Sequence, residues 1–326
     1  MILKLSLLGK LITLQFVDDI AFCENSGRYS LIGSYKRSFM NKLACVVIWY
    51  NPSMLEVQNI RTYNSTFEKV YIIDNSNTDN KNLAGEITNS VYIPNRKNLG
   101  IAAALNTGCQ KAYNDGFDWC MTMDQDSTWF SDFLEMYLKE FSLNQSDLTV
   151  SFAPAMNLSA KSFSIIGDIR RFFTKKEDLP EKQFVENVMT SGNIINLKIW
   201  EKIGRFEEKL FIDEVDSDFC FRLISAGYRI LKFSNIFFNH TLGNPKKSFF
   251  PMTYSYHEKR CYYISRNKRY LISKYPELAH KYSHSLMLNL FVLGKILTAQ
   301  FSDMRYILQG KSDFKHNIFG EYNGRA

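Results

Sequence analysis

The sequence predicts an α/β protein with a mostly parallel β-sheet flanked by helices. Apolar runs of strand length, such as Leu43–Trp49, alternate with helical patterns such as Leu99–Tyr113. This order is typical of parallel strands joined by right-handed crossovers. Several runs also end directly in polar residues, and ligands gather at the carboxyl ends of parallel strands. The two observations indicate the fold class and the sheet edge at which a site is expected.

The first half of the chain shows the clearest pattern. Leu43–Trp49 (LACVVIW) is apolar throughout, as in a strand buried on both faces. The alanine-rich face of Leu99–Tyr113 favours a helix. The other elements expected here are strands at Lys69–Ile73, Val91–Ile93 and Trp119–Met123, and helices at Met54–Phe67 and Ser131–Phe141, the last capped by Ser131.

The next part of the chain, from residue 148 to residue 240, is more mixed. The segments LTVSFAP (148–154), FSIIGDI (163–169) and NVMTSGNII (187–195) alternate like strands. We further expect a short helix at Leu197–Gly204 with Gly204 as its C-cap, a helix at Phe219–Ala226 stopped by Gly227, and a strand at Tyr228–Phe233.

Residues 1–39 form an N-terminal extension of uncertain status. Their apolar stretch is broken by Lys10 and no small-residue cleavage site follows, so it does not match a signal peptide. The stretch is also too interrupted to span a bilayer. It is either a weak amphipathic segment or sequence upstream of a start at Met40.

The C-terminal part combines positive charge with apolar helical patterns. From His240 onward the chain holds 14 Lys and Arg against five Asp and Glu, while the whole chain carries a net charge of +7. His257–Tyr275 mixes Tyr with Arg and Lys, and Ser285–Phe301, which contains Lys295, is strongly apolar. The residues of the second stretch that share one face are Leu286, Leu290, Leu293 and Leu297. This helix either lies in a membrane interface or packs on its own domain.

Composition excludes several classes of protein. Of the 326 residues, 45% are apolar and 15% aromatic, which supports a sizeable core. Six cysteines without a C-x-x-C pair predict buried thiols in a reducing compartment, not zinc ligands or a disulfide framework. The basic C-terminal part predicts an anionic membrane surface or an acidic partner. No nucleic-acid-binding signature is present, so we expect no nucleic-acid partner.

Two acids follow the strand Trp119–Met123. Asp124 and Asp126 are one residue apart, so in an extended chain both side chains point to the same side. Two carboxylates this close repel each other unless they share a proton or bind a divalent cation such as Mg²⁺ or Mn²⁺. The alternative is a solvated turn, since D-Q-D-S is also good turn chemistry. Asn51 and Asp74 end neighbouring strands at the same edge, which favours a nucleotide site there.

Five segments, in this order, resemble family 2 glycosyltransferases of the GT-A fold, and most of all the bacterial rhamnosyltransferase group. They are VVIWYNP, IIDNSNTD, NRKNLGIAAALNTG, MDQDS, and LFIDEVDSDFCFRL followed by His240. The resemblance covers about Lys42 to Tyr275. The resemblance implies a GT-A (Rossmann-like) catalytic domain over residues 40–245, with a nucleotide-binding half (40–128) and an acceptor half (129–245). Residues 246–326 would be a basic, amphipathic, helical region that associates with a membrane.

The resemblance also implies roles for individual residues. The residues that match positions contacting the nucleotide are Asn51, Asp74, Asn98, Gly100 and Asp124, with Asp74 recognising the base or ribose. Arg96 and Lys97 either add charge beside the phosphates or are simply solvated. Asp124 and Asp126 match the D-x-D pair that binds the metal and diphosphate, with His240 as a third ligand and Mn²⁺ or Mg²⁺ as cofactor.

The catalytic base is identified by counting back from Arg222 along the E-D-x-D-x-x-x-R pattern of relatives. This count places Asp216 as the base, although Val215 stands where Glu is common. Asp213, Asp218 and Arg222 could support it, and Asp218 is expected to bond backbone amides or Arg222. Ser191 and Gly192 match a close-approach turn beside donor and acceptor.

Together these features imply an inverting glycosyltransferase. The resemblance favours dTDP-L-rhamnose as donor, with UDP-galactofuranose, UDP-glucose and UDP-galactose as alternatives, and a polysaccharide or lipid-linked glycan as acceptor. The enzyme would be cytoplasmic, peripheral on the inner face of the cell membrane, and could form a homo-oligomer. The two rival hypotheses are a non-catalytic membrane-bound assembly module and a nucleotidyltransferase. Nucleotidyltransferases usually carry a Gly-rich N-terminal signature after the first strand, and the segment WYNPSM of this chain lacks it.

Overall fold

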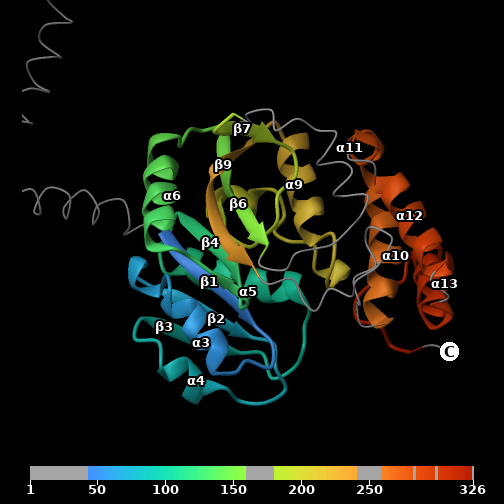
Figure 1. Cartoon of the computed structure of the whole chain (residues 1–326), viewed down its shortest axis with the longest axis horizontal. Coiled ribbons are helices and arrows are strands. Elements are labelled where there is room, and N and C mark those ends of the chain that lie inside the picture. The colour runs from blue at the N-terminus through green and yellow to red at the C-terminus, as the bar shows by residue number, and fades with distance from the viewer. Residues whose placement is uncertain (1–42, 159–179, 241–257, 282–283, 298–299, 325–326) are drawn as a thin grey trace, which may run out of the picture. The chain divides into compact units, whose positions relative to one another are not determined.

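Four parallel strands form the first half of the sheet (Figure 1). In spatial order they are β3 (Ser90–Pro94), β2 (Val70–Asp74), β1 (Leu43–Trp49) and β4 (Trp119–Asp124). The alternation of helices with these strands confirms the predicted α/β class. The computed structural model describes residues 43–158, 180–240, 258–281, 284–297 and 300–324, so the extension at residues 1–39 lies outside the described residues.

The second half of the sheet is mixed in direction. β8 (Asn193–Asn196) pairs antiparallel with β4 and with β6 (Thr149–Leu158), and β9 (Arg229–His240) is parallel to β6. Two short strands, β5 (Ser127–Thr128) and β7 (Lys182–Val185), pair antiparallel with β9. The pairing of β5 with β9 brings the D-x-D turn beside the end of β9.

Apolar side chains cover both faces of the sheet, as the continuous run in β1 predicts. Ala44, Val46 and Ile48 belong to one buried cluster, while the alternate residues of β1 belong to another. The helices and 3₁₀ turns around the sheet are α3 (Met54–Arg61), η1 (Asn64–Thr66), α4 (Lys81–Gly85), α5 (Ile101–Asn114), α6 (Ser131–Leu143), α8 (Leu197–Lys202), η2 (Glu208–Leu210) and α9 (Val215–Ser225).

Four C-terminal helices complete the described chain (Figure 1, orange and red). They are α10 (Glu258–Lys274), α11 (Pro276–Lys281), α12 (His284–Leu297) and α13 (Phe301–Lys315). α10, α12 and α13 pack on one another around a small aromatic cluster that includes Tyr262, Tyr263 and Phe291. In the part of the chain that is described, no helix is both long and apolar enough to cross a membrane.

Several predicted boundaries were wrong for local reasons. Phe130, not Ser131, is the N-cap of α6, and the Ser131 hydroxyl bonds Asp132 instead. The segment 187–195 becomes a strand only at Asn193, because Gly192 turns the chain with a φ of +78°. α8 is capped by Ile203 rather than by Gly204, which follows it at φ +94°.

Other elements are longer or shorter than expected. α9 begins four residues before Phe219, and β9 continues to His240. α3 ends at Arg61, ahead of the 3₁₀ turn η1. β7 was not expected, and α13 lies in the predicted helical region 246–326 but was not predicted as a separate helix. The predicted strand at residues 163–169 lies outside the described residues. The cysteines whose placement is described, Cys45, Cys109, Cys120, Cys220 and Cys261, are free and buried, as predicted.

Candidate active site

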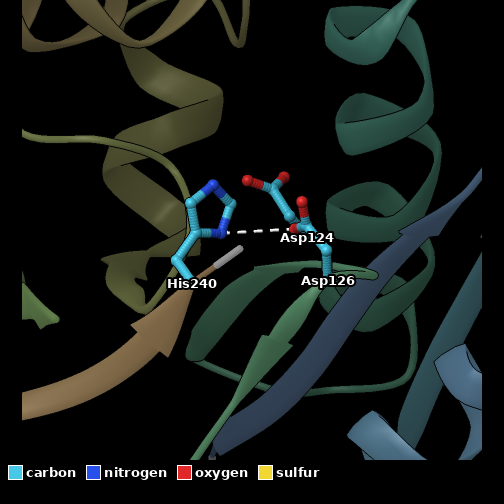
Figure 2. A group of neighbouring side chains, drawn as sticks. All are labelled: Asp124, Asp126 and His240. Atoms are coloured by element: carbon cyan, nitrogen blue, oxygen red, sulfur yellow. Dashed lines mark ion pairs between the residues drawn. The ribbon is translucent and has the colours of Figure 1, made fainter. Parts of the chain in front are cut away.

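Three potential metal ligands meet where β4 and β9 end (Figure 2). Asp124 is the last residue of β4, Asp126 follows in the turn, and His240 is the last residue of β9. One ligand atom from each lies within 4.8 Å of the others, and His240 Nδ1 is 3.2 Å from Asp126 Oδ1. The sheet thus brings together residues more than 110 positions apart in sequence, as the register of Ser127 with His240 requires.

Two serines hold this group in place. Ser127 Oγ lies 2.8 Å from His240 Nδ1 and 2.8 Å from Ser191 Oγ. Ser191 Oγ in turn accepts a hydrogen bond of 3.1 Å from the Asp124 backbone N–H. Sequence reasoning selected Ser191 but missed Ser127, whose position directly after the D-x-D pair was the available signal. Such outer contacts orient ligating side chains.

The charge of this group fits a divalent cation. Asp126 Oδ1 is buried and accepts no hydrogen bond from the residues that the structure describes. Burial and the nearby charge of Asp126 raise the pKa of Asp124 to about 6. Burial likewise raises the pKa of Asp126. Two carboxylates and an imidazole are ligands that Mn²⁺ accepts, and a cation would offset the clustered negative charge.

Asp74, expected at the nucleotide, is fully buried and fixes its own loop. Oδ1 accepts hydrogen bonds from the Ser76 N–H (2.9 Å) and hydroxyl (2.5 Å). Oδ2 accepts from Asn80 Nδ2 and the Tyr92 hydroxyl, each at 2.8 Å. A carboxylate offers about four acceptor sites, so this one is saturated by its loop together with Tyr92 of β3. In this structure Asp74 shapes the polar end of β2.

The remaining residues expected at the nucleotide also lie at the carboxyl edge of the sheet. Asn51, with a φ of 48°, donates its N–H to Ser76 Oγ at 2.7 Å. Asn98 Oδ1 accepts the N–H of Gly100 at 3.0 Å. Gly100 is the N-cap of α5, and a Cβ there would lie 2.5 Å from the carbonyl oxygen of Phe211. Close packing of two chain segments therefore explains this glycine.

Two further predicted positions have local partners. Arg96 forms a 2.8 Å ion pair with Asp79 on the surface. Gly192 packs against Pro154, which a Cβ would approach to 2.9 Å, and its carbonyl accepts the buried Tyr137 hydroxyl at 2.9 Å. The turn containing Ser191 and Gly192 therefore lies directly against β6 and the D-x-D pair.

The predicted base, Asp216, lies in the first turn of α9. Its Oδ1 accepts the N–H of Ser217 at 2.8 Å. Burial, and then the negative charges of Glu214 and Asp213, raise the pKa of Asp216 to about 7. A carboxyl group with this pKa can take up a proton near neutral pH.

The neighbouring acids are engaged with α10, an arrangement that sequence reasoning missed. Asp213 forms a 3.0 Å ion pair with Arg260. Asp218 is fully buried and accepts Arg222 Nε at 2.8 Å, as expected, and also Lys274 Nζ at 3.0 Å. The available signal was the seven-residue spacing of Arg260, Asn267 and Lys274 in α10, which places these polar residues on one helix face.

Arg260 of α10 lies near acids of both the candidate metal group and the loop before α9. It pairs with Asp213, and its positive charge also acts to lower the pKa of Asp124, against burial and the charge of Asp126. The candidate metal ligands and the loop that carries Asp216 therefore lie near the same cation.

The chain is similar to known glycosyltransferases. The family model described as "Glycosyl transferase family 2" matches residues 54–204. A dTDP-rhamnosyl transferase, RfbF of Shigella flexneri, is 25% identical over 251 residues, which cover 72% of this chain and 81% of that protein.

Two solved structures share the fold. GalNAc-T7 with UDP, GalNAc and Mn²⁺ is 13% identical with a TM-score of 0.52, and the match covers 85% of this chain but only 57% of that one. Residues 1–349 of TarS from S. aureus, in complex with UDP-GlcNAc, are 14% identical with a TM-score of 0.51, over 84% of this chain and 80% of that one. These likenesses confirm the predicted GT-A architecture.

Proposed function

Because this chain is a family 2 glycosyltransferase through its residues 54–204, we propose that it transfers a sugar from a nucleotide-sugar donor with inversion at the anomeric carbon. The observation that carries the proposal is the meeting of Asp124, Asp126 and His240 near the loop of Asp216. The two acids and the histidine suit a metal-bound diphosphate. Asp216 supplies a carboxylate that can act as a base near neutral pH.

The reaction is a single displacement. An acceptor hydroxyl oxygen attacks the anomeric carbon while the bond from that carbon to the diphosphate oxygen breaks. Asp216 takes the hydroxyl proton, and the bonding electron pair leaves with the nucleoside diphosphate. A divalent cation held by Asp124, Asp126 and His240 would stabilise the charge on the departing diphosphate.

The proposed donor is dTDP-L-rhamnose. The 25% identity to a dTDP-rhamnosyl transferase supports this choice, and the three UDP-sugars named above are the alternatives. The proposed acceptor is a hydroxyl of a polysaccharide or lipid-linked glycan.

The proposed location is the inner face of the cell membrane, and exposed apolar side chains on the C-terminal helices support contact with lipid. The leucines that were expected to share one face of α12, Leu286, Leu290, Leu293 and Leu297, are 42–56% exposed. On α13 the exposed residues Phe301, Arg305, Leu308 and Lys315 recur at helical spacing, so cations lie among the apolar side chains. This combination favours an anionic lipid surface.

Not all of the basic residues serve this surface. Lys295 is 1% exposed and forms a 2.6 Å ion pair with Asp303 inside the helical cluster. Lys268 and Lys274 of α10 pair with Glu214 and Asp218, so we do not assign them to this surface.

The lipid location is tested by sedimentation with vesicles of phosphatidylglycerol and of phosphatidylcholine. We expect binding to the anionic vesicles, loss of binding in Leu290→Glu, and retention in Leu143→Glu, a matched change at a 67% exposed leucine on α6. Equal sedimentation of both variants would contradict the lipid location.

The transferase activity is tested by incubating wild type and Asp216→Asn with each donor, Mn²⁺ and a bacterial lipid extract. We expect wild type to consume one donor and move its sugar into the lipid fraction. Loss of a general base should slow this step by about 10²–10⁴-fold in the variant. Consumption of no donor, or equal rates for both proteins, would refute the proposal.

A further inference from the structure

The loop that leads to Asp216 has an unusual backbone. Residues 210–214, here called the base loop, contain three non-glycine residues with positive φ: Phe211 (66°), Asp213 (64°) and Glu214 (63°). Side chains with a Cβ rarely adopt this left-handed region, and such residues persist only where surrounding structure fixes them. The base loop therefore depends on what packs against it.

One side chain of α10 fixes the course of this backbone. Asn267 is fully buried, and its Nδ2 donates to the carbonyl oxygens of Leu210 (2.8 Å), Ile212 (2.7 Å) and Asp213 (3.0 Å). An amide nitrogen carries two N–H groups, so one of them is shared between two carbonyls. These three oxygens belong to the segment whose φ angles are positive.

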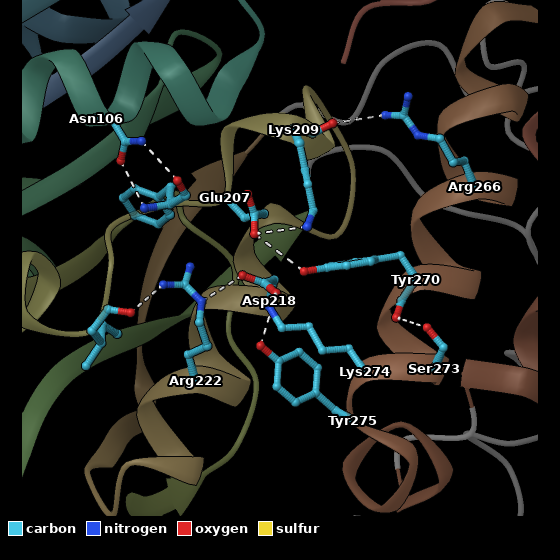
Figure 3. A network of polar contacts seen from close by, with 12 residues as sticks. Asn106, Glu207, Lys209, Asp218, Arg222, Arg266, Tyr270, Ser273, Lys274 and Tyr275 are labelled. Carbon is cyan, nitrogen blue, oxygen red and sulfur yellow. Dashed lines mark hydrogen bonds and ion pairs between the residues drawn. The ribbon is translucent and has the colours of Figure 1, made fainter. Parts of the chain in front are cut away.

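Arg266 supports Asn267 and extends the contact. Its Nε donates to Asn267 Oδ1 at 2.9 Å, which sets the orientation of the amide. Its Nη2 donates to the Leu210 carbonyl at 3.0 Å, and Figure 3 shows the same guanidinium directed toward the carbonyl of Lys209. The ring of Phe211 also stacks on Tyr263 of α10, with centroids 5.2 Å apart.

Charged pairs continue the contact along both sides of the base loop. Lys268 pairs with Glu214, the N-cap residue of α9. Lys274 and the Tyr275 hydroxyl reach Asp218 one turn into α9, at 3.0 and 3.2 Å (Figure 3). Asp216 therefore lies between two acids that α10 holds from outside.

These pairs also set the charge around Asp216. Glu214 and Asp213 face it from its own loop, and Cys220 lies close by on α9. The cations opposite these acids are Lys268 and Arg260 of α10, while His284 of α12 stands 3.6 Å from Glu214 Oε2. Removing Lys268 would leave the charge of Glu214 uncompensated beside the base.

We propose that α10 is a latch on the base loop, and that Asn267 and Lys268 are positioning residues for sugar transfer. The inference rests on the proposed function, since it presumes Asp216 as base. Asn267 acts on the backbone that carries Asp216, and Lys268 acts on the charge beside it. Neither residue belongs to the candidate metal group, so donor binding and the chemical step should respond differently.

The test compares Asn267→Ala and Lys268→Met with matched controls at surface sites, Asn114→Ala on α5 and Lys198→Met, whose lysine pairs with Asp118. Donor binding with Mn²⁺ is measured by calorimetry, and kcat by nucleotide release. We expect unchanged donor Kd in every variant, and a kcat lower by about 10²-fold in Asn267→Ala, as a small misplacement of a reacting group produces.

Lys268→Met provides the second, independent measurement. With Glu214 uncompensated, Asp216 holds its proton more tightly, so the acidic limb of the kcat profile should move to higher pH. Lys268→Arg should restore the wild-type profile because it keeps the charge.

The possible failures are distinguishable. A wild type that consumes no donor contradicts the proposed function itself. Wild-type kcat and pH profile in both Asn267→Ala and Lys268→Met would overturn the latch alone. Loss of donor binding in parallel with kcat in Lys268→Met would also overturn it, because a positioning role leaves the donor site intact.

Discussion

Replacing Asp216 by Asn should stabilise the protein at neutral pH while it removes the proposed base. Burial, then the charges of Glu214 and Asp213, raise the pKa of the Asp216 carboxyl from 3.8 to about 7. The folded protein therefore retains a proton that the unfolded chain releases between these pH values. The stability linked to that proton is present below the unfolded pKa and is lost as the pH rises through about 7.

The magnitude follows from the size of the shift. The pKa difference is roughly three units, and each unit corresponds to about 1.4 kcal/mol, so ionised Asp216 destabilises the folded state by about 4 kcal/mol above neutral pH. Asn has nearly the same shape and no charge, and its carbonyl oxygen can still accept the Ser217 N–H. The variant should therefore lack this pH-dependent loss.

The assay is urea unfolding of wild type and Asp216→Asn across a range of pH. The difference in free energy of unfolding should be near zero well below the unfolded pKa and rise to about 4 kcal/mol above neutral pH, with the variant more stable. Asp147→Asn, a change at an exposed acid before β6, should give no such trend. A difference between wild type and Asp216→Asn that stays constant with pH would refute the reasoning.

Two further predictions concern residues around the candidate site. Gly100→Ala should lower the free energy of unfolding by on the order of 1–3 kcal/mol or more, because the φ of Gly100 is +84° and a Cβ there would lie 2.5 Å from a carbonyl oxygen. Gly116 has a φ of +90° but no atom within 4 Å of such a Cβ, so Gly116→Ala should show a smaller decrease in Tm. Equal decreases would contradict the packing argument. Ser127→Ala removes the contact that orients His240 and should weaken Mn²⁺ binding in calorimetry by about tenfold or more. Ser142→Ala, at an exposed hydrogen bond in α6, should leave the affinity unchanged, and an equal effect of both serine changes would contradict an orienting role.

The parallel half of the fold could be predicted because its strands are buried on both faces. In Leu43–Trp49 every residue is buried, and such a run has few alternatives to a central strand. The directions of β6, β8 and β9 could not be derived in the same way, because apolar alternation is the same in parallel and antiparallel pairs. Short strands such as β7, whose residues are half-buried or exposed, carry little signal at all.

The candidate metal group was predictable because the order of the strands in the sheet places its two acids at the carboxyl edge. Strand ends gather at one edge of a parallel sheet, so Asp124 and Asp126 were expected to meet other polar strand ends. The role of His240 came from resemblance, and the structure brings it to the two acids. Ser127 was missed because its position directly after the D-x-D pair does not by itself show that β5 pairs with the end of β9.

The spacing of polar residues in α10 indicates a polar helix face, but the residues that this face contacts could not be derived from the sequence. Arg260 and Asp213 are 47 positions apart, and Lys268 and Glu214 are 54 apart. Because lysines and arginines are usually solvated, a cluster of them beside apolar helices is typical of a membrane surface. Only the fold shows that acids of the base loop lie within reach of these cations.

We propose that Asp126 helps to hold the metal that binds the donor. The most direct test is calorimetric titration of dTDP-rhamnose and the three UDP-sugars into wild type and Asp126→Ala, each with and without Mn²⁺, with Asp147→Ala as control. We expect one donor to bind wild type and the control only when Mn²⁺ is present, and we expect Asp126→Ala not to bind it. Donor binding that is indifferent to both Mn²⁺ and Asp126 would contradict this role of Asp126.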